Sequence, residues 1–224
     1  MKNLSNVDIH QFLSQCEGKF VEGRTTQYEG KTYAIPYSTV VINNTKIVGL
    51  RENEKRLELL ERTIDEHSSS RQSYMDIGCN IGVFVKYFSD KFSSVMGIDA
   101  EPYYINQAKF LFEDIKDSYV LNNLNTISLG SLVTEPIDVI TSLSMIEYIT
   151  NKKKFVKDLY SLTNELCIIE GHSEDIKLGY DIIYENMLKK KDWEVTRLPD
   201  VTDAGINAPQ DTQAKGRPIW ICKK

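Results

Sequence analysis

Long hydrophobic runs are missing from this sequence. No apolar stretch approaches the roughly 18 to 20 uncharged residues of a membrane span, and the first residues lack the apolar core of a signal peptide. The four cysteines lie far apart without a Cys-x-x-Cys pair, which argues against a dense disulfide framework. We therefore expect a cytoplasmic protein with no membrane partner.

An excess of basic charge is also missing. The chain has 27 Lys and Arg against 32 Asp and Glu, a formal net charge of -5, so no global basic field attracts a polyanion. Nucleic acid is therefore not favoured as a partner, although total charge does not exclude a local basic patch. With 41% hydrophobic residues, the 224-residue chain can bury a full core, as a monomer or a homodimer.

What the chain does contain is an alternation of apolar runs with amphipathic segments. This pattern predicts an α/β fold with a largely parallel sheet and helices on both faces. Strands are expected at residues 74–77, 94–98, 126–129, 137–144, 166–171, 193–198 and 218–223. Helices are expected at residues 83–88, 103–117, 152–162 and 181–190.

The first 69 residues have a different pattern. The expected elements there are helices at residues 7–16 and 51–67 and hairpin-like segments at residues 30–35 and 38–50. Asn43-Asn44 is a plausible hairpin turn, and the serine-rich residues 66–72 indicate a linker. We therefore divide the chain into an N-terminal helical and hairpin extension, residues 1–69, and a sheet domain, residues 70–224.

The segment SYMDIGCNIGVFVKYFS at residues 73–89 leads from an apolar strand into a helix through a turn with little side-chain bulk. Glycines 78 and 82 adopt left-handed conformations freely, and Asn80 tolerates them better than most residues. Such a turn brings backbone N–H groups close to a ligand at a helix N-terminus. A nicotinamide-binding Gly-x-Gly-x-x-Gly turn would need glycine where this chain has Asn80 and Val83.

The turn resembles the first motif of class I S-adenosylmethionine (SAM) dependent methyltransferases, which Asp76, Gly78, Asn80 and Gly82 fill. VMGIDAEP then places Asp99 after the second strand, where a carboxylate can accept hydrogen bonds from both ribose hydroxyls. IDVITSLSMIEYI is similar to the fourth strand of the family and the turn after it, and the last strands resemble its terminal reversed hairpin. The resemblance covers residues 70–224 and implies a Rossmann-like, seven-stranded, mostly parallel sheet with a reversed C-terminal strand.

The resemblance also implies SAM as the cofactor and S-adenosyl-L-homocysteine (SAH) as its product. The residues expected to contact the cofactor are Asp76, Gly78, Cys79, Asn80, Gly82, Asp99, Ala100, Ser131, Leu132, Ser142 and Ser144. Many relatives place an acidic residue against the adenine amino group after the third strand, whereas this chain has Gly130-Ser131-Leu132 there. The Ser131 hydroxyl and the Leu132 N–H are the expected substitutes.

The catalytic candidates follow from topology. Ligands of an open parallel sheet bind beyond the carboxyl ends of its strands, so the loops at residues 144–148, 170–175 and 199–217 are expected to frame a methyl acceptor. His172 is the candidate general base, because an intrinsic pKa near 6.5 suits proton removal from a hydroxyl. Glu147 and Tyr148 could orient the cofactor or the acceptor. His172 could instead hydrogen-bond the end of a strand, and Glu147 could simply begin a helix.

Two further groups of residues are open to a functional interpretation. A metal site built from Glu170, His172 and Asp175 is conceivable but has no evident fourth ligand, so no metal is predicted. Three residues of the extension are candidates to close over the cofactor or the acceptor, although packing and surface charge explain them as well: Tyr33, Tyr37 and Arg51.

Three functions are compatible with these observations. The favoured one is a SAM-dependent methyltransferase that transfers a methyl group to an oxygen, or a nitrogen, of a small-molecule or sugar acceptor. The alternatives are an RNA-modifying methyltransferase, which needs a basic surface, and a SAM-binding protein without catalysis. DNA methylation is not favoured, because the Asn/Asp-Pro-Pro-aromatic motif and the Pro-Cys pair are both absent.

Overall fold

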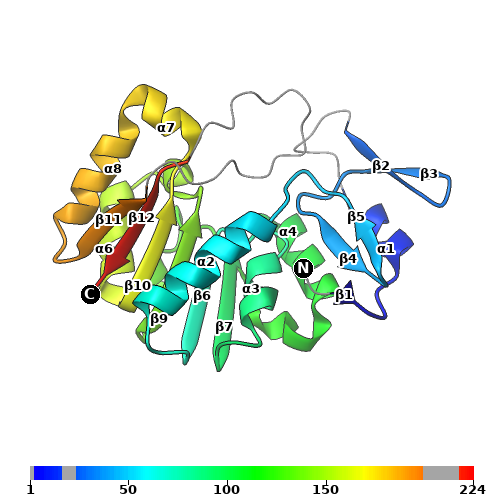
Figure 1. Cartoon of the computed structure of the whole chain (residues 1–224), viewed down its shortest axis with the longest axis horizontal. Coiled ribbons are helices and arrows are strands. Elements are labelled where there is room, and N and C mark those ends of the chain that lie inside the picture. The colour runs from blue at the N-terminus through cyan, green and yellow to red at the C-terminus, as the bar shows by residue number, and fades with distance from the viewer. Residues whose placement is uncertain (1–2, 17–23, 199–216) are drawn as a thin grey trace.

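The computed structural model describes residues 3–16, 24–198 and 217–224, which are built around one seven-stranded sheet (Figure 1). The strand order is β11-β12-β10-β9-β6-β7-β8. The strands are β6 (Ser73–Ile77), β7 (Ser94–Asp99), β8 (Tyr119–Leu121), β9 (Ile137–Leu143), β10 (Thr163–Glu170), β11 (Glu194–Leu198) and β12 (Ile219–Lys223). Strand β12 is antiparallel to β10 and β11, and the other neighbouring pairs are parallel. This topology confirms the predicted fold class.

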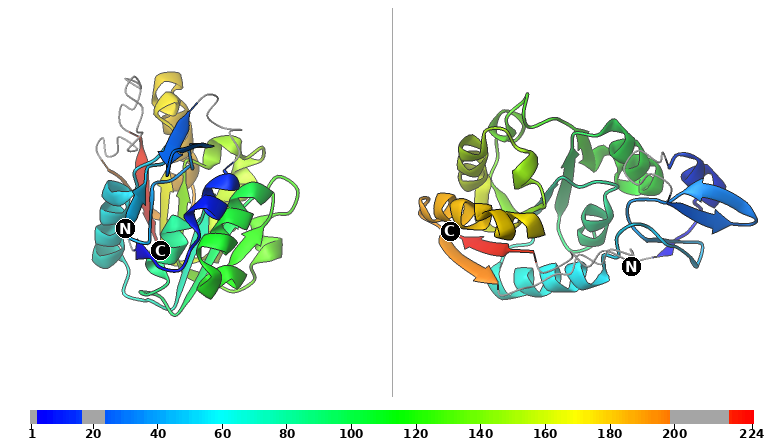
Figure 2. Two further views of the ribbon diagram at one scale, coloured as in Figure 1. Left: turned by 90° about the vertical axis from the view of Figure 1, so that its right-hand side faces the viewer. Right: turned by 90° about the horizontal axis from the view of Figure 1, so that it is seen from above.

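Helices cover both faces of the sheet. One face is covered by α2 (Glu54–His67), α3 (Val83–Phe88) and α4 (Pro102–Leu111), and the other by α5 (Leu129–Leu132), α6 (Lys152–Leu162) and α8 (Tyr180–Lys189). A short helix, α7 (Ser173–Leu178), lies between β10 and α8. Figure 2 (right) shows the cyan helix α2 on one side of the strands and the gold helix α8 on the other.

The hydrophobic clusters on the two faces of the sheet follow from the alternation of side chains along a strand. In β6, Tyr74 faces α3, where its ring lies 4.6 Å from that of Phe88, while Met75 belongs to the opposite core with Leu159 and Leu188. All four cysteines are buried and free, as small hydrophobic residues of these cores. No helix in the described ranges is long and apolar enough to cross a membrane.

Two predictions around the third strand are wrong. The expected strand at residues 126–129 is a loop that leads into α5, and the third strand is β8. β8 was missed because it is an edge strand of three residues, too short to give a periodic signal, whereas Thr126 and Ile127 have high strand propensity. The helix expected at residues 103–117 ends at Leu111, and a 3₁₀ segment with a kink at Ile115 follows.

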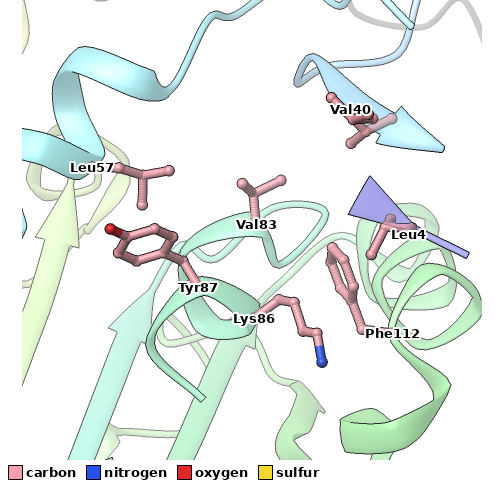
Figure 3. A pocket seen from close by; sticks show the side chains of 8 residues that line it. Leu4, Val40, Leu57, Val83, Lys86, Tyr87 and Phe112 are labelled. Carbon is pink, nitrogen blue, oxygen red and sulfur yellow. The ribbon is translucent and has the colours of Figure 1, made fainter. Parts of the chain in front are cut away.

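The described part of the N-terminal region, residues 3–16 and 24–50, forms two small sheets and one helix, which lies beside α4 (Figure 1). Its elements are β1 (Asn3–Leu4), α1 (Ile9–Ser14), β2 (Thr25–Tyr28), β3 (Lys31–Ala34), β4 (Val40–Ile42) and β5 (Thr45–Ile47). Asn43 and Asn44 have φ values of 49° and 61° between β4 and β5, which confirms the predicted hairpin turn. An apolar crevice between this region and α3 is lined by Leu4, Val40, Leu57, Val83 and Phe112 (Figure 3).

The serine-rich segment is held firmly to the sheet. The Glu165 carboxylate accepts hydrogen bonds from the Ser68 hydroxyl and the Ser69 N–H, each at 2.8 Å, and Asp138 accepts from the N–H of Gln72 at 3.0 Å. We call these contacts the serine clasp. Helix α2, just before the clasp, packs on the sheet through Leu60 and Ile64. The division of the chain at residue 69 stays a prediction.

Candidate active site

The turn between β6 and α3 has the backbone that its sequence predicts. Gly78, Asn80 and Gly82 have φ values of 78°, 53° and 76°. Neighbouring side chains also require the two glycines. A Cβ atom on Gly78 would lie 2.3 Å from Cγ of Met145, and one on Gly82 would lie 2.4 Å from the Tyr119 ring. Met145 thus brings the loop after β9 directly against the turn.

The backbone N–H groups of the turn are used inside the protein, which differs from the expectation that they face a ligand. Gly78 and Cys79 both donate to the carbonyl of Ile98, at 2.8 and 3.0 Å, and Asn80 donates to Oδ2 of Asp99 at 2.9 Å. These bonds tie the turn to the end of β7. The turn is therefore preorganised by the neighbouring strand before any ligand binds.

Asp99 joins two loops at the carboxyl edge of the sheet. Besides the bond from Asn80, its Oδ1 accepts a hydrogen bond from the Glu101 N–H at 2.9 Å. Burial raises the pKa of Asp99, and the N–H groups of Glu101 and Asn80 oppose that rise. Ala100, the next expected contact, is exposed beside it.

Asp76 lies beneath the turn and is 1% exposed. Its Oδ1 accepts a hydrogen bond from the Thr141 hydroxyl at 2.7 Å, while its Oδ2 is buried without a partner among the described residues. Burial raises the pKa of Asp76 to about 7, against the opposing effects of Thr141 and of the Arg56 charge. Oδ2 of Asp76 can therefore accept a proton or a hydrogen bond.

Not every residue expected to contact the cofactor is exposed at the carboxyl edge of the sheet. Cys79 is buried under the turn, and Ser142 is fully buried within β9 with its hydroxyl unpartnered among the described residues. Ser131 and Leu132 lie in α5 rather than directly after the third strand, because that strand is β8 and ends at Leu121. The residues directly after β8 are Asn122 and the exposed Asn123.

A buried cluster of charges at the ends of β9 and β10 was not predicted as a unit. Glu170, 1% exposed, accepts hydrogen bonds from Arg56 at 2.5 Å, Arg217 at 3.2 Å and the Ser144 hydroxyl at 2.6 Å. Burial would raise the pKa of Glu170, but the two guanidinium groups lower it. Ser144 has a φ of 59°, in the left-handed region, and its N–H donates to the Glu170 carbonyl at 2.8 Å.

The catalytic candidates lie next to this cluster. Nε2 of His172 is 3.2 Å from Oε1 of Glu147, and the His172 N–H donates to Asp175 at 2.6 Å at the start of α7. Burial and the Arg217 charge lower the pKa of His172, while Glu147 opposes the shift. Tyr148 is 63% exposed, and its partial burial together with the nearby Glu147 raises the pKa of its hydroxyl to about 12.

The conceivable metal site does not fit this geometry. Glu170 is engaged by two guanidinium groups, and Asp175 accepts a hydrogen bond from the His172 backbone. Within residues 3–16, 24–198 and 217–224, no group of three or more His, Cys, Asp or Glu side chains is arranged to hold a metal ion.

The extension reaches the site through Tyr37 and Arg51. The Tyr37 ring packs edge to face on Tyr104, with centroids 5.6 Å apart, and the Arg51 guanidinium lies 5.9 Å above the Tyr37 ring. Tyr33 does not reach the site, because its hydroxyl contacts His10 at 2.6 Å within the extension. Except for Arg217, the expected acceptor loop at residues 199–217 lies outside the described residues.

Comparisons with known proteins agree with this geometry. A family model described as a methyltransferase domain matches residues 50–199. A SAM-dependent methyltransferase from Clostridium acetobutylicum is 13% identical, with a TM-score of 0.59 over 76% of this chain and 91% of its own. The N-methyltransferase NodS from Bradyrhizobium japonicum, solved with SAH, is 12% identical, with a TM-score of 0.57 over 76% and 86%.

The methyltransferase domain of a bacterial Hen1 protein is 14% identical, with a TM-score of 0.57 over 77% of this chain and 99% of its own. At these low sequence identities, the structural likeness shows a shared fold alone. No curated protein sequence matches the chain. Because the family model spans more than half of the chain and the sheet has the matching topology, this chain belongs to the SAM-dependent methyltransferases with a class I Rossmann-like fold.

Proposed function

We propose that this methyltransferase transfers the methyl group of SAM to an oxygen, or a nitrogen, of a small-molecule acceptor such as a sugar. The observation that carries the proposal is the 3.2 Å contact between His172 and Glu147 at the carboxyl edge of the sheet. Met145, two residues before Glu147, packs on Gly78, so this pair adjoins the glycine turn.

The residues of the turn fit the cofactor. The ribose hydroxyls can donate to the Asp99 carboxylate, which is anchored by two backbone N–H groups. The ammonium group of the methionine end can donate to Oδ2 of Asp76, the buried oxygen that no described residue satisfies. Asn122 and Asn123, which follow β8, are the better candidates for adenine, in place of Ser131 and Leu132.

The chemistry required of the chain is alignment and proton removal. When bound, SAM supplies an electrophilic methyl group for an in-line displacement. A lowered pKa keeps the His172 imidazole neutral at pH 7. With Nε2 of His172 beside the Glu147 carboxylate, the lone pair of the neutral imidazole lies on Nδ1, on the side of the ring that caps the Asp175 N–H at the start of α7. The imidazole must give up this cap contact to take the proton of a hydroxyl acceptor. The Glu147 carboxylate then stabilises the imidazolium.

The net charge of the chain favours a small acceptor over RNA. The chain carries a formal net charge of -5, and a polyanion needs a basic surface for affinity. The cytoplasmic location and the monomeric or homodimeric state stay predictions.

The experiment is a turnover assay on the full chain. The protein is incubated with SAM and a panel of sugars, hydroxy acids, sugar phosphates, amines and short RNAs, and SAH formation is measured. We expect turnover with a small molecule, and methylation of RNA alone would overturn the proposal. His172→Asn is the informative variant, because asparagine still caps α7 but is not a base. His67→Asn at the end of α2 is its matched control.

A further inference from the structure

Arg51 is a cation with no anionic partner among the described residues, and it lies inside the site. Its Nε and Nη1 atoms are buried without a hydrogen-bond partner. Buried guanidinium nitrogens are normally satisfied, because leaving such donors unpaired costs stability. The backbone holds Arg51 in place, since its N–H donates to the Tyr37 carbonyl and its carbonyl accepts from the Thr39 N–H, both at 2.8 Å.

Three described carboxylates near His172 and Arg217 are already engaged. Glu170 is bound by Arg56 and Arg217, Glu147 contacts His172, and Asp175 accepts from the His172 backbone. Arg51 and Arg56 both lower the pKa of Arg217 by charge repulsion, in addition to the larger effect of burial. Arg51 and Arg217 therefore present positive charge to the same space, and the buried Nε and Nη1 of Arg51 have no partner among the described residues.

Arg51 lies between the part of the site expected to hold the cofactor and the proton-accepting His172. On one side, the Tyr37 ring beneath it packs on Tyr104, next to the Asn80 and Asp99 end of the turn. On the other side, its charge is close enough to lower the pKa of His172. A ligand group that met the Arg51 donors would thus lie between the cofactor and the proton-accepting pair.

We propose that Arg51, together with the nearby positive charge of Arg217, forms a binding site for an anionic oxygen group of the methyl acceptor, a carboxylate or a phosphate. The inference rests on the proposed function, because it specifies the class of acceptor. The carboxylate of the cofactor has the same chemistry, so the second set of measurements in the test separates it from the acceptor. An arginine with unpaired N–H donors matches the oxygens of a carboxylate or a phosphate.

The test measures binding, so it does not depend on turnover. Sodium phosphate, and separately sodium acetate, is titrated calorimetrically into the SAH-saturated full chain at constant ionic strength. We expect both probes to bind, and Arg51→Gln to weaken binding about 10- to 100-fold, as for lost hydrogen bonds to a charged group. Arg51→Lys should restore part of the affinity. Arg62→Gln, on the exposed side of α2, removes the same charge elsewhere and should change nothing.

A second set of measurements shows whether Arg51 binds the acceptor or the carboxylate of the cofactor itself. The affinities of SAH and of 5′-methylthioadenosine, which lacks the amino-acid end, are measured for the parent and for Arg51→Gln. Equal affinities in both proteins support an acceptor site. Loss of SAH affinity alone would show that Arg51 holds the cofactor carboxylate, and it would overturn the inference. Phosphate and acetate binding that Arg51→Gln leaves unchanged would overturn it too. Failure of every small molecule in the turnover assay would contradict the proposed function instead.

Discussion

Nε2 of His172 lies 3.2 Å from Oε1 of Glu147, a contact that joins the loop after β9 to the loop after β10. The two residues are far apart in the sequence and meet only because β9 and β10 are parallel neighbours. A carboxylate behind an imidazole orients the ring and stabilises its protonated form. The pair therefore gives the site a proton acceptor next to the turn that holds the methyl donor.

We expect His172→Asn to reduce turnover by roughly 10² to 10⁴ and to leave SAH affinity unchanged, because the imidazole removes a proton and does not hold the cofactor. The parent rate should hold down to pH 6.5, the ordinary histidine pKa, and fall only below it, because the pKa of His172 is shifted downward and only neutral imidazole accepts a proton. The turnover number measured from pH 5 to 9 checks both statements. An unchanged rate in the variant would exclude the base role.

Asp99→Ala should weaken SAH binding by about 1.5 to 3 kcal/mol, the usual contribution of hydrogen bonds to a charged group. The same loss is expected for 5′-methylthioadenosine, since both compounds carry the ribose. Calorimetry on protein shown to be folded by circular dichroism provides the measurement. Asp114→Ala, an exposed carboxylate paired with Lys86, is the control. Parental affinity in a folded Asp99→Ala protein would contradict the ribose assignment.

Gly78→Ala and Gly30→Ala form a matched pair. Both glycines have left-handed backbones, with φ values of 78° and 75°, but only Gly78 has a neighbour, Met145, where a Cβ would lie. Each substitution should cost about 1 to 2 kcal/mol of unfolding free energy through the backbone alone. We expect Gly78→Ala to cost more and to weaken SAH binding as well. Equal costs in urea denaturation would show that Met145 moves aside freely.

Because of the serine clasp, we expect the free energy of unfolding to decrease at acid pH. Burial would raise the pKa of Glu165, but hydrogen bonds from Ser70, Ser68 and Ser69 lower it below the ordinary 4.5. A lowered folded-state pKa stabilises the protein above the unfolded-state value, and this stability is lost as pH falls through the folded-state value. Glu165→Gln should therefore lower the free energy of unfolding at pH 7 and flatten its decline below pH 4.5. Urea denaturation across pH, with the exposed Glu113→Gln as control, tests this.

Local sequence patterns predicted the parts of the site that lie within single segments. The backbone of the glycine turn and the Asn43-Asn44 hairpin follow from residue types whose backbone preferences are strong. The role of Asp99 at the ribose stays a prediction. The pattern failed at β8, where three edge residues carry no periodicity, and this error moved the expected adenine contacts into α5.

Contacts between distant segments could not be predicted in the same way. Arg56 and Glu170 are separated by 114 positions, and nothing in a charged helix such as α2 marks one arginine as the buried one. The contact of Tyr37 with Tyr104 likewise depends on how the extension packs, which local periodicity does not report.

The burial of all four thiols has a practical consequence. Burial raises the pKa of Cys16 to about 11 and that of Cys167 to about 12, and it raises the pKa values of Cys79 and Cys222 well above the ordinary thiol value. Thiolate is the reactive form, so alkylating reagents at pH 7 to 8 should leave the native chain unmodified. A cysteine introduced at the exposed Tyr148 would then be the single labelled position, where a fluorophore can report acceptor arrival without removal of any native cysteine.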